Sequence, residues 1–151
     1  MGYMESKIRW GVVGPGKIAR KFASDLQLVE DAILSGVGSR NLQRAKEFAD
    51  EFEVPHVFDS YEELFQSPEV DVLYIATPHN FHKDLAIMAM EHEKHILCEK
   101  PLGISRAEVQ EMVEASKRNN VFLMEALWSR FNPTIQKVKQ MIDDGELGKL
   151  C

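Results

Sequence analysis

The sequence has few cysteines, no long apolar run and no excess of basic residues, and each shortage excludes a class of protein. Two cysteines among 151 residues cannot build a disulfide framework or a metal site of typical ligand spacing. No apolar stretch approaches the roughly 20 residues of a transmembrane helix, and the start lacks the layout of a signal peptide. A formal net charge of −6 argues against nucleic acid as a partner, because binding a phosphate backbone needs a basic face. We therefore expect a cytoplasmic protein with no metal, no membrane contact and no nucleic-acid partner.

Apolar runs and helical patterns alternate along the whole chain. Strands are predicted over residues 8–13, 32–37, 57–58, 70–76, 95–98 and 121–124, and helices over 17–26, 41–52, 61–65, 80–91, 105–119 and 133–143. Asn41, Ser60 and Ser105 are predicted helix caps, the last two within capping boxes completed by Glu63 and Glu108. This alternation is typical of right-handed βαβ crossovers and predicts one α/β domain with a doubly wound, mostly parallel sheet. Cys98, inside an apolar strand, is expected to be a buried, inert thiol.

A glycine-rich turn follows the first strand. Residues 14–19 match G-x-G-x-x-G/A, directly after a strand and at the start of a helix, which is the context that gives this pattern its meaning. The first glycine permits the tight turn, and the second lets the backbone approach a pyrophosphate. Free N–H groups and the helix dipole then favour the anion. A turn without a ligand is the alternative. The predicted cofactor contacts here are Gly14, Pro15, Gly16, Lys17 and Ile18.

The end of the second strand predicts which dinucleotide binds. NAD-binding proteins usually place an acid there for the ribose 2′-hydroxyl, but residues 36–46 contain none. Ser39 and Arg40 can instead donate hydrogen bonds to a 2′-phosphate, and Arg44, one helical turn further on, adds a second cation. The two arginines are otherwise solvated residues of a helix start. NADP is therefore favoured, and NAD stays open.

Two further segments are expected at the same edge of the sheet. Residues 76–82 follow the fourth strand, and residues 99–103 follow the fifth. The Glu99–Lys100 pair directly after a buried strand is not required for folding, and it costs desolvation free energy unless the charges have partners.

These motifs resemble the glucose–fructose oxidoreductase, inositol dehydrogenase and related sugar dehydrogenase family (Gfo/Idh/MocA). The resemblance covers essentially the whole chain. It rests on the glycine turn, on Thr77–Pro78 with His82, on residues 99–101 and on the run 125–133, which is most similar to dihydrodiol and NADP-dependent xylose dehydrogenases. It implies a Rossmann NAD(P)-binding domain and NAD(P)-linked hydride transfer at a sugar, polyol or trans-diol carbon.

The resemblance also implies roles for individual residues. Lys100 matches the family's active-site lysine, which would donate a hydrogen bond to the substrate oxygen. Glu99 is expected to orient the segment, and Lys100–Pro101 is a candidate cis peptide bond. The implied nicotinamide-side contacts are Thr77, Pro78, His79, His82, Glu99, Lys100, Trp128 and Arg130. Alternatives stay open for three of them: a surface lysine for Lys100, a helix-start residue satisfied by backbone for His82, and packing for Trp128.

Family members continue into a second, α+β domain that holds the substrate and often the oligomer interface. The resemblance therefore implies that residues 1–151 are the cofactor-binding half, with the substrate domain missing, and that this chain alone binds cofactor but turns over poorly. A non-catalytic NAD(P)-binding sensor of the same fold is the alternative function. The sequence does not indicate which substrate is used.

Overall fold

The computed structural model describes residues 7–148. Residues 1–6, which match the short sequence pattern for N-myristoylation, and Cys151 lie outside them. The strands are β1 (Ile8–Val13), β2 (Ala32–Gly38), β3 (His56–Phe58), β4 (Val72–Ile75), β5 (His95–Cys98) and β6 (Leu123–Glu125). The α-helices are α1 (Lys17–Leu26), α2 (Leu42–Phe52), α3 (Tyr61–Gln66), α4 (His82–Glu91), α5 (Arg106–Arg118) and α6 (Pro133–Asp143). Two 3₁₀ turns, η1 (His79–Phe81) and η2 (Trp128–Phe131), precede α4 and α6.

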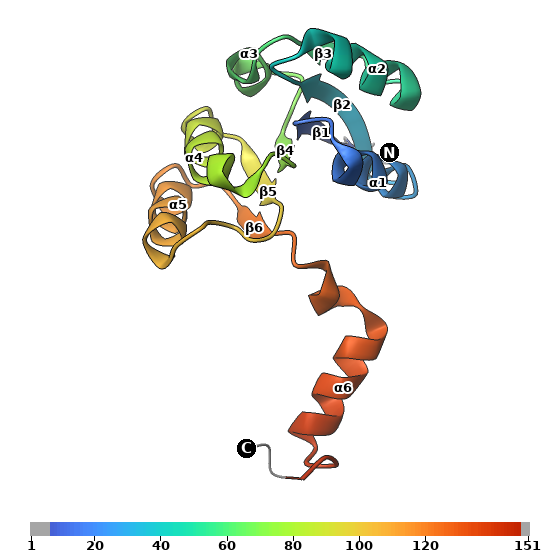
Figure 1. The fold of residues 1–151 in the computed structure, drawn as a ribbon, viewed down its shortest axis with the longest axis vertical. Helices are drawn as coiled ribbons and strands as arrows, with labels where there is room; N and C mark the ends of the chain where they lie inside the picture. The colour runs from blue at the N-terminus through green and yellow to red at the C-terminus, as the bar shows by residue number, and fades with distance from the viewer. Residues whose placement is uncertain (1–6, 149–151) are drawn as a thin grey trace, which may run out of the picture.

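The strands form one six-stranded sheet in the order β3-β2-β1-β4-β5-β6, and every neighbouring pair is parallel. The predicted doubly wound parallel sheet is confirmed. Helices α1 and α2 lie on one side of the sheet and α4 and α5 on the other (Figure 1). Two buried clusters fill the two interfaces, one around Leu73 and Met90 and one around Val12 and Phe48. Both faces of the central strands are covered, so these strands are continuously apolar.

Three predicted element starts differ from the structure by two residues. The α-helix predicted from residue 80 begins at His82, because Phe81 N–H bonds to Pro78 O at 3.0 Å and closes a 3₁₀ turn first. The fourth strand begins at Val72 rather than residue 70. The sixth begins at Leu123 rather than residue 121, because Val121 N–H bonds back to Ser116 O and closes the end of α5.

Asn41, Ser60 and Ser105 each accept a hydrogen bond from a backbone N–H of the following helix, as predicted. The reciprocal bond of a capping box is absent at both serines among the described residues: no bond joins Ser60 N–H to Glu63, and the Glu108 carboxylate accepts from Ile104 N–H. Glu108 therefore holds the residue before the cap.

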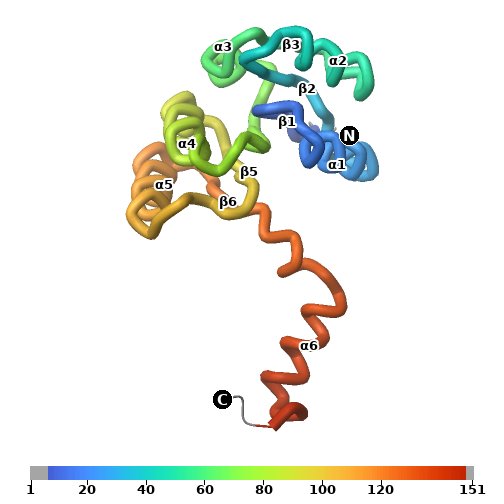
Figure 2. The backbone as a smooth tube through the Cα atoms, in the orientation of Figure 1, coloured from blue at the N-terminus to red at the C-terminus, as the bar shows by residue number. Residues whose placement is uncertain are grey.

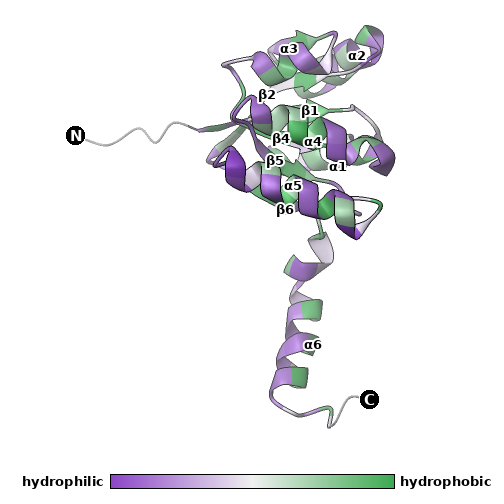
Figure 3. Cartoon of the chain, turned by 90° about the vertical axis from the view of Figure 1, so that its left-hand side faces the viewer, coloured by the Kyte–Doolittle hydropathy of each residue, from purple (hydrophilic) through white to green (hydrophobic). Residues whose placement is uncertain are grey.

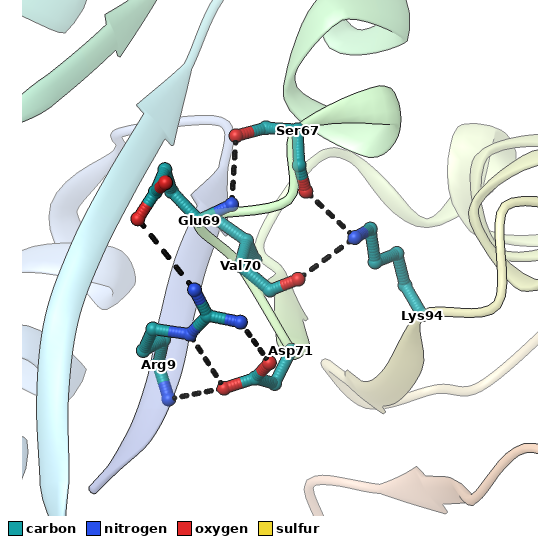
Figure 4. A network of polar contacts seen from close by, with 6 residues as sticks. All are labelled: Arg9, Ser67, Glu69, Val70, Asp71 and Lys94. Carbon is teal, nitrogen blue, oxygen red and sulfur yellow. Dashed lines mark hydrogen bonds and ion pairs between the residues drawn. The ribbon is translucent and has the colours of Figure 1, made fainter. Parts of the chain in front are cut away.

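A polar network lies at the amino ends of the strands, opposite the edge with the glycine turn (Figure 4). Arg9 of β1 binds Asp71 through two side-chain bonds of 2.6 and 3.0 Å. Lys94 Nζ donates to Ser67 O at 2.7 Å and to Val70 O at 2.8 Å. Because Lys94 takes the Val70 carbonyl, β4 starts two residues later than the apolar pattern suggests.

Helix α6 extends away from the sheet (Figures 1 and 2). Polar and apolar residues share its surface along its length (Figure 3). Ile135, Val138 and Ile142 recur at helical spacing and are 37–50% exposed. No helix in the described part of the chain is long and apolar enough to cross a membrane.

Candidate cofactor site

The carboxyl ends of β1 and β4 meet where the strand order reverses. Chain connections leave these two neighbouring strands toward opposite faces of the sheet, which opens a crevice between them. The glycine turn follows β1, and Thr77–Pro78 follows β4. The predicted phosphate turn and the predicted nicotinamide-side segment therefore share one edge of the sheet.

The turn has the backbone that the glycine pattern predicts. Gly14 adopts φ +85°, and a Cβ on it would lie 3.0 Å from Thr77 Cγ2. At Gly16 a Cβ would meet nothing within 4 Å, so the space above this residue is open. Gly16 is the N-cap of α1 and makes no side-chain cap hydrogen bond. The first amides of α1 thus face open space at the positive end of the helix dipole.

A cavity of about 600 Å³, here called the phosphate cavity, lies over this turn. Its lining from the predicted set is Gly14, Pro15, Gly16, Ser39, Arg40, Arg44, Thr77 and Pro78. Asn41, Tyr61, Ala76, Phe81 and Leu85 complete it. The lining contains two arginines and no acidic residue. This charge balance favours an anionic ligand over a neutral one.

Arg40 reaches across the phosphate cavity. Its guanidinium carbon lies 5.1 Å from the ring centroid of Phe81, within cation–π range. Ser39 is buried at 7% exposure, and its Oγ accepts from Asn41 N–H at 3.1 Å. Its hydroxyl hydrogen is left available as a donor. Arg40 and Arg44 form no ion pair with any described residue, so both charges are available to a ligand.

A second cavity of about 520 Å³, here called the apolar cavity, lies beside the first turns of α1 and over β4, β5 and β6. Ile18, Glu99 and Trp128 line it, as do Phe22 and Leu97. Ile18 thus lines the apolar cavity, whereas Gly16 lines the phosphate cavity. Trp128 is 69% exposed, so within residues 7–148 it is not a buried packing residue.

Glu99 lines the apolar cavity together with three other polar residues, Lys21, Asp25 and Tyr74. It accepts hydrogen bonds from the Tyr74 hydroxyl and from Lys100 N–H, the latter at 3.2 Å. Burial, and then the bond to Glu99, raises the pKa of Tyr74 above its ordinary value. Tyr74 is therefore a hydrogen-bond donor throughout the physiological range, and its ring stacks on Phe22 at 3.9 Å between centroids. The two hydrogen bonds from Tyr74 and from Lys100 N–H offset the desolvation cost of the Glu99 charge.

Lys100 is exposed at the carboxyl edge, and its peptide bond to Pro101 is cis. The predicted cis bond is confirmed. The neighbouring Cys98 is fully buried, and burial raises the pKa of its thiol to about 12. It is the inert thiol that the sequence predicted.

His82 differs from its primary prediction as a cofactor contact. It is 1% exposed, and it lines neither cavity. Its Nε2 lies 2.9 Å from Thr77 O, and its Nδ1 lies 2.9 Å from Pro101 O. The alternative left open by the sequence, a histidine satisfied by backbone, is the one that the structure shows. His82 joins the Thr77 segment to the Lys100 turn.

Four other predicted residues also lie outside both cavity linings. They are Lys17, His79, Lys100 and Arg130, all exposed at the carboxyl edge of the sheet. Sequence reasoning missed Phe81, Tyr61 and Leu85 in the phosphate cavity, because apolar residues in such segments are not distinguishable from packing residues. It also missed Tyr74 and Glu125, which bind the segment around Lys100. Glu125 is the last residue of the half-buried strand β6, and its partner Leu102 lies 23 residues away, so no local pattern in the sequence singles it out.

The described residues fit a dinucleotide. Thr77 Oγ1 is buried and has no hydrogen-bond partner among them, so it is a polar group left for a ligand. The open space above Gly16 would admit a pyrophosphate, and the arginines offer charge at the β2 end. The two cavities together follow the carboxyl edge from β2 to β6.

The model of an oxidoreductase family with an NAD-binding Rossmann fold matches residues 8–127. The chain belongs to this family. The match extends from the start of β1 to just beyond β6, so the whole sheet lies within it. Every residue that lines the phosphate cavity falls in the matched region.

Several dihydrodiol dehydrogenases are similar to this chain. The trans-1,2-dihydrobenzene-1,2-diol dehydrogenase of Mus musculus is 43% identical over 146 residues, which cover 95% of this chain and 44% of that protein. The enzyme of the same name from Macaca fascicularis is 40% identical over 145 residues, covering 95% and 43%. The chain thus spans less than half the length of these relatives.

Solved structures agree on the fold. A 3-ketoreductase from Actinomadura kijaniata, in complex with TDP-benzene and NADP, superposes with a TM-score of 0.90 at 27% identity, over 96% of this chain and 46% of that one. A probable dehydrogenase from Thermotoga maritima gives 0.87 at 32% identity, over 94% and 43%. The fold and its cofactor class, NAD(P), are those of the family.

Proposed function

We propose that this chain is the cofactor-binding domain of an NADP-dependent oxidoreductase that interconverts an alcohol and a carbonyl on a diol, polyol or sugar. The observation that carries the proposal is the phosphate cavity, which is lined by the glycine turn, by Thr77 and by two arginines that form no ion pair among residues 7–148. The substrate class is supported by the diol dehydrogenases to which the chain is 37–43% identical. The chain spans less than half of each, so the activity is proposed for a protein that joins it to a substrate-binding part.

The geometry supports NADP over NAD. A 2′-phosphate at the end of β2 would lie between Ser39, Arg40 and the first turn of α2, where Arg44 projects from the same helix. Charge-assisted bonds from two arginines favour this dianion, and no carboxylate lines the cavity to repel it.

The test compares NADPH and NADH affinity by calorimetry for the wild type and for Arg40→Ala, with Arg118→Ala as a control on the far helix α5. We expect wild type to prefer NADPH, and Arg40→Ala to weaken NADPH binding about 10- to 100-fold while leaving NADH nearly unchanged, as one charge-assisted contact of ~1.5–3 kcal/mol implies. Equal wild-type affinities for the two cofactors would reject the NADP assignment.

Lys100 is proposed as the residue that acts on the substrate. The bound cofactor supplies or accepts a hydride, and the alcohol oxygen must lose or gain a proton in the same reaction. The exposed Lys100 ammonium, held at the strand edge beside the apolar cavity, would donate a hydrogen bond to that oxygen and stabilise its developing negative charge.

Replacing Lys100 with alanine should lower kcat by two or more orders of magnitude, in line with loss of one such donor, while NADPH affinity stays close to wild type. Stopped-flow hydride transfer and cofactor titration measure the two quantities separately. Normal turnover in Lys100→Ala would exclude this role and would favour a cofactor-binding sensor.

A further inference from the structure

Three consecutive residues of the turn after β5 are each held by a different side chain. Lys100 N–H donates to Glu99 Oε2 at 3.2 Å. Pro101 O lies 2.9 Å from His82 Nδ1, and Leu102 N–H donates to Glu125 Oε1 at 2.8 Å. The three side chains come from the ends of β5 and β6 and from the start of α4. The backbone on both sides of the Lys100 side chain is therefore fixed from three directions.

Glu125 is the member of this set to which neither the motif analysis nor the cofactor site gives a role. It is the last residue of β6 and pairs in register with Cys98, the last residue of β5. Its backbone therefore stands beside the point where the chain leaves β5 toward Lys100. Its carboxylate reaches forward to Leu102, two residues beyond the lysine.

The carboxylate of Glu125 is costly at this position. The residue is half-buried, and among residues 7–148 it forms no ion pair. Desolvating a carboxylate without a counter-charge lowers stability unless hydrogen bonds offset it, and an apolar residue would suit the end of a strand better. The hydrogen bond that the carboxylate accepts from Leu102 N–H offsets part of this desolvation cost.

We infer that Glu125 is a positioning residue for Lys100. By accepting from Leu102 N–H it holds the far side of the turn, while Glu99 holds the near side, and together they fix the direction in which the lysine leaves the sheet. The inference rests on the proposed role of Lys100. A displacement of about 1 Å at a catalytic group can cost roughly 100-fold in rate, so a residue that touches neither substrate nor cofactor can control turnover here.

The experiment uses the complete protein and three substitutions. Glu125→Ala removes the acceptor, and Glu125→Gln keeps an acceptor oxygen without the charge. Glu108→Ala is the matched control, because Glu108 also accepts a backbone N–H, that of Ile104, in the same segment at 3.0 Å. Glu125→Leu, which keeps the side-chain volume, takes the place of the alanine variant if that variant does not fold.

We expect Glu125→Ala to lower kcat roughly 10- to 100-fold with NADPH affinity unchanged, Glu125→Gln to recover most of the loss, and Glu108→Ala to match the wild type. Because Glu125 acts through the lysine, Glu125→Ala combined with Lys100→Ala should be no slower than Lys100→Ala alone. A kcat for Glu125→Ala equal to that of Glu108→Ala, or a fully additive double variant, overturns the inference.

Amide hydrogen exchange tests the same inference without turnover. Glu125→Ala should speed exchange at Leu102 and its neighbours in 99–103, whereas Glu108→Ala should speed it only around Ile104. Unchanged exchange at Leu102 in Glu125→Ala overturns the inference. If Lys100→Ala keeps normal turnover, the proposed function fails whatever Glu125 does. If Lys100→Ala is inactive and Glu125→Ala is normal, only the inference fails.

Discussion

At the scale of single residues, Gly14 and Gly16 lie in one turn, but an added methyl group is crowded only at Gly14. Gly14 has φ +85°, and its Cβ would lie 3.0 Å from Thr77 Cγ2. Gly14→Ala should therefore cost about 1–3 kcal/mol of unfolding free energy. At Gly16 no described atom lies within 4 Å of the new Cβ. Gly16→Ala should therefore keep wild-type stability and bind NADPH roughly tenfold more weakly or worse, a loss of ~1.4 kcal/mol, because the methyl fills space proposed for the pyrophosphate.

Urea unfolding and NADPH titration of both variants separate the two effects. Full NADPH affinity in a folded Gly16→Ala protein would show that the pyrophosphate does not bind above this glycine. Wild-type stability in Gly14→Ala would show that the left-handed turn is not strained by a side chain.

Sequence reasoning located residues whose chemistry depends on the backbone around them, and it was less successful where tertiary contacts decide. The glycine turn was predictable because only glycine adopts its φ cheaply. His82 carries no such local signal, because the two carbonyls that surround it come from Thr77 and from Pro101, 19 residues further on. Glu125 was equally hidden, since its partner lies 23 residues away.

At the scale of elements, Arg9 and Asp71 join the start of β1 to the start of β4. The bond from the Arg9 guanidinium lowers the pKa of the Asp71 carboxyl below its ordinary value of 3.8. A carboxyl with a lowered folded-state pKa stabilises the protein above the unfolded value and loses this contribution as pH falls through the folded one. Arg9→Met should thus lower the unfolding free energy at pH 7, by a modest amount because the pair is partly exposed and screened by solvent.

The difference between Arg9→Met and the wild type should shrink as pH falls below 3.8, since protonated Asp71 no longer pairs with the guanidinium. Urea unfolding of both proteins across this range measures it, and Arg118→Met serves as the control for loss of a surface arginine. A stability difference that stays constant with pH would show that the Arg9 side chain joins β1 to β4 by packing and not by its charge.

Periodicity and helix caps predicted which segments form helices and which form strands, but they did not predict where each one begins and ends. The apolar run that begins at Val70 predicted a strand start there. In the structure the Val70 carbonyl instead accepts a hydrogen bond from Lys94 Nζ at 2.8 Å. Val121 is likewise apolar, yet its N–H closes α5 through Ser116 O. At both places a specific long- or medium-range hydrogen bond outweighs the local pattern, which records burial but not bonding partners.

At the scale of the whole molecule, the strand order places the glycine turn and the β4 segment at one crevice, and alternation of strands and helices was enough to predict this. It was not enough to predict that the edge divides into two cavities. The apolar cavity depends on η2, which brings Trp128 and Phe131 toward Phe22 of α1. The same segment leads into α6, which extends away from the sheet (Figure 2).

The described residues hold every part proposed for cofactor binding but only one group proposed for proton transfer. Lys100 is exposed, and Glu99 beside it is occupied by Tyr74 and by Lys100 N–H. The 151-residue chain should therefore bind NADPH without efficient turnover. At NADPH concentrations 100 times Kd, binding should add about 2.7 kcal/mol to the unfolding free energy, which raises Tm by roughly 5–10 °C for a chain of this size. Arg40→Ala should show a smaller rise at the same concentration. Absence of any shift, or turnover of trans-diols by the chain at a rate near that of a protein carrying a substrate-binding part, would contradict this division of labour.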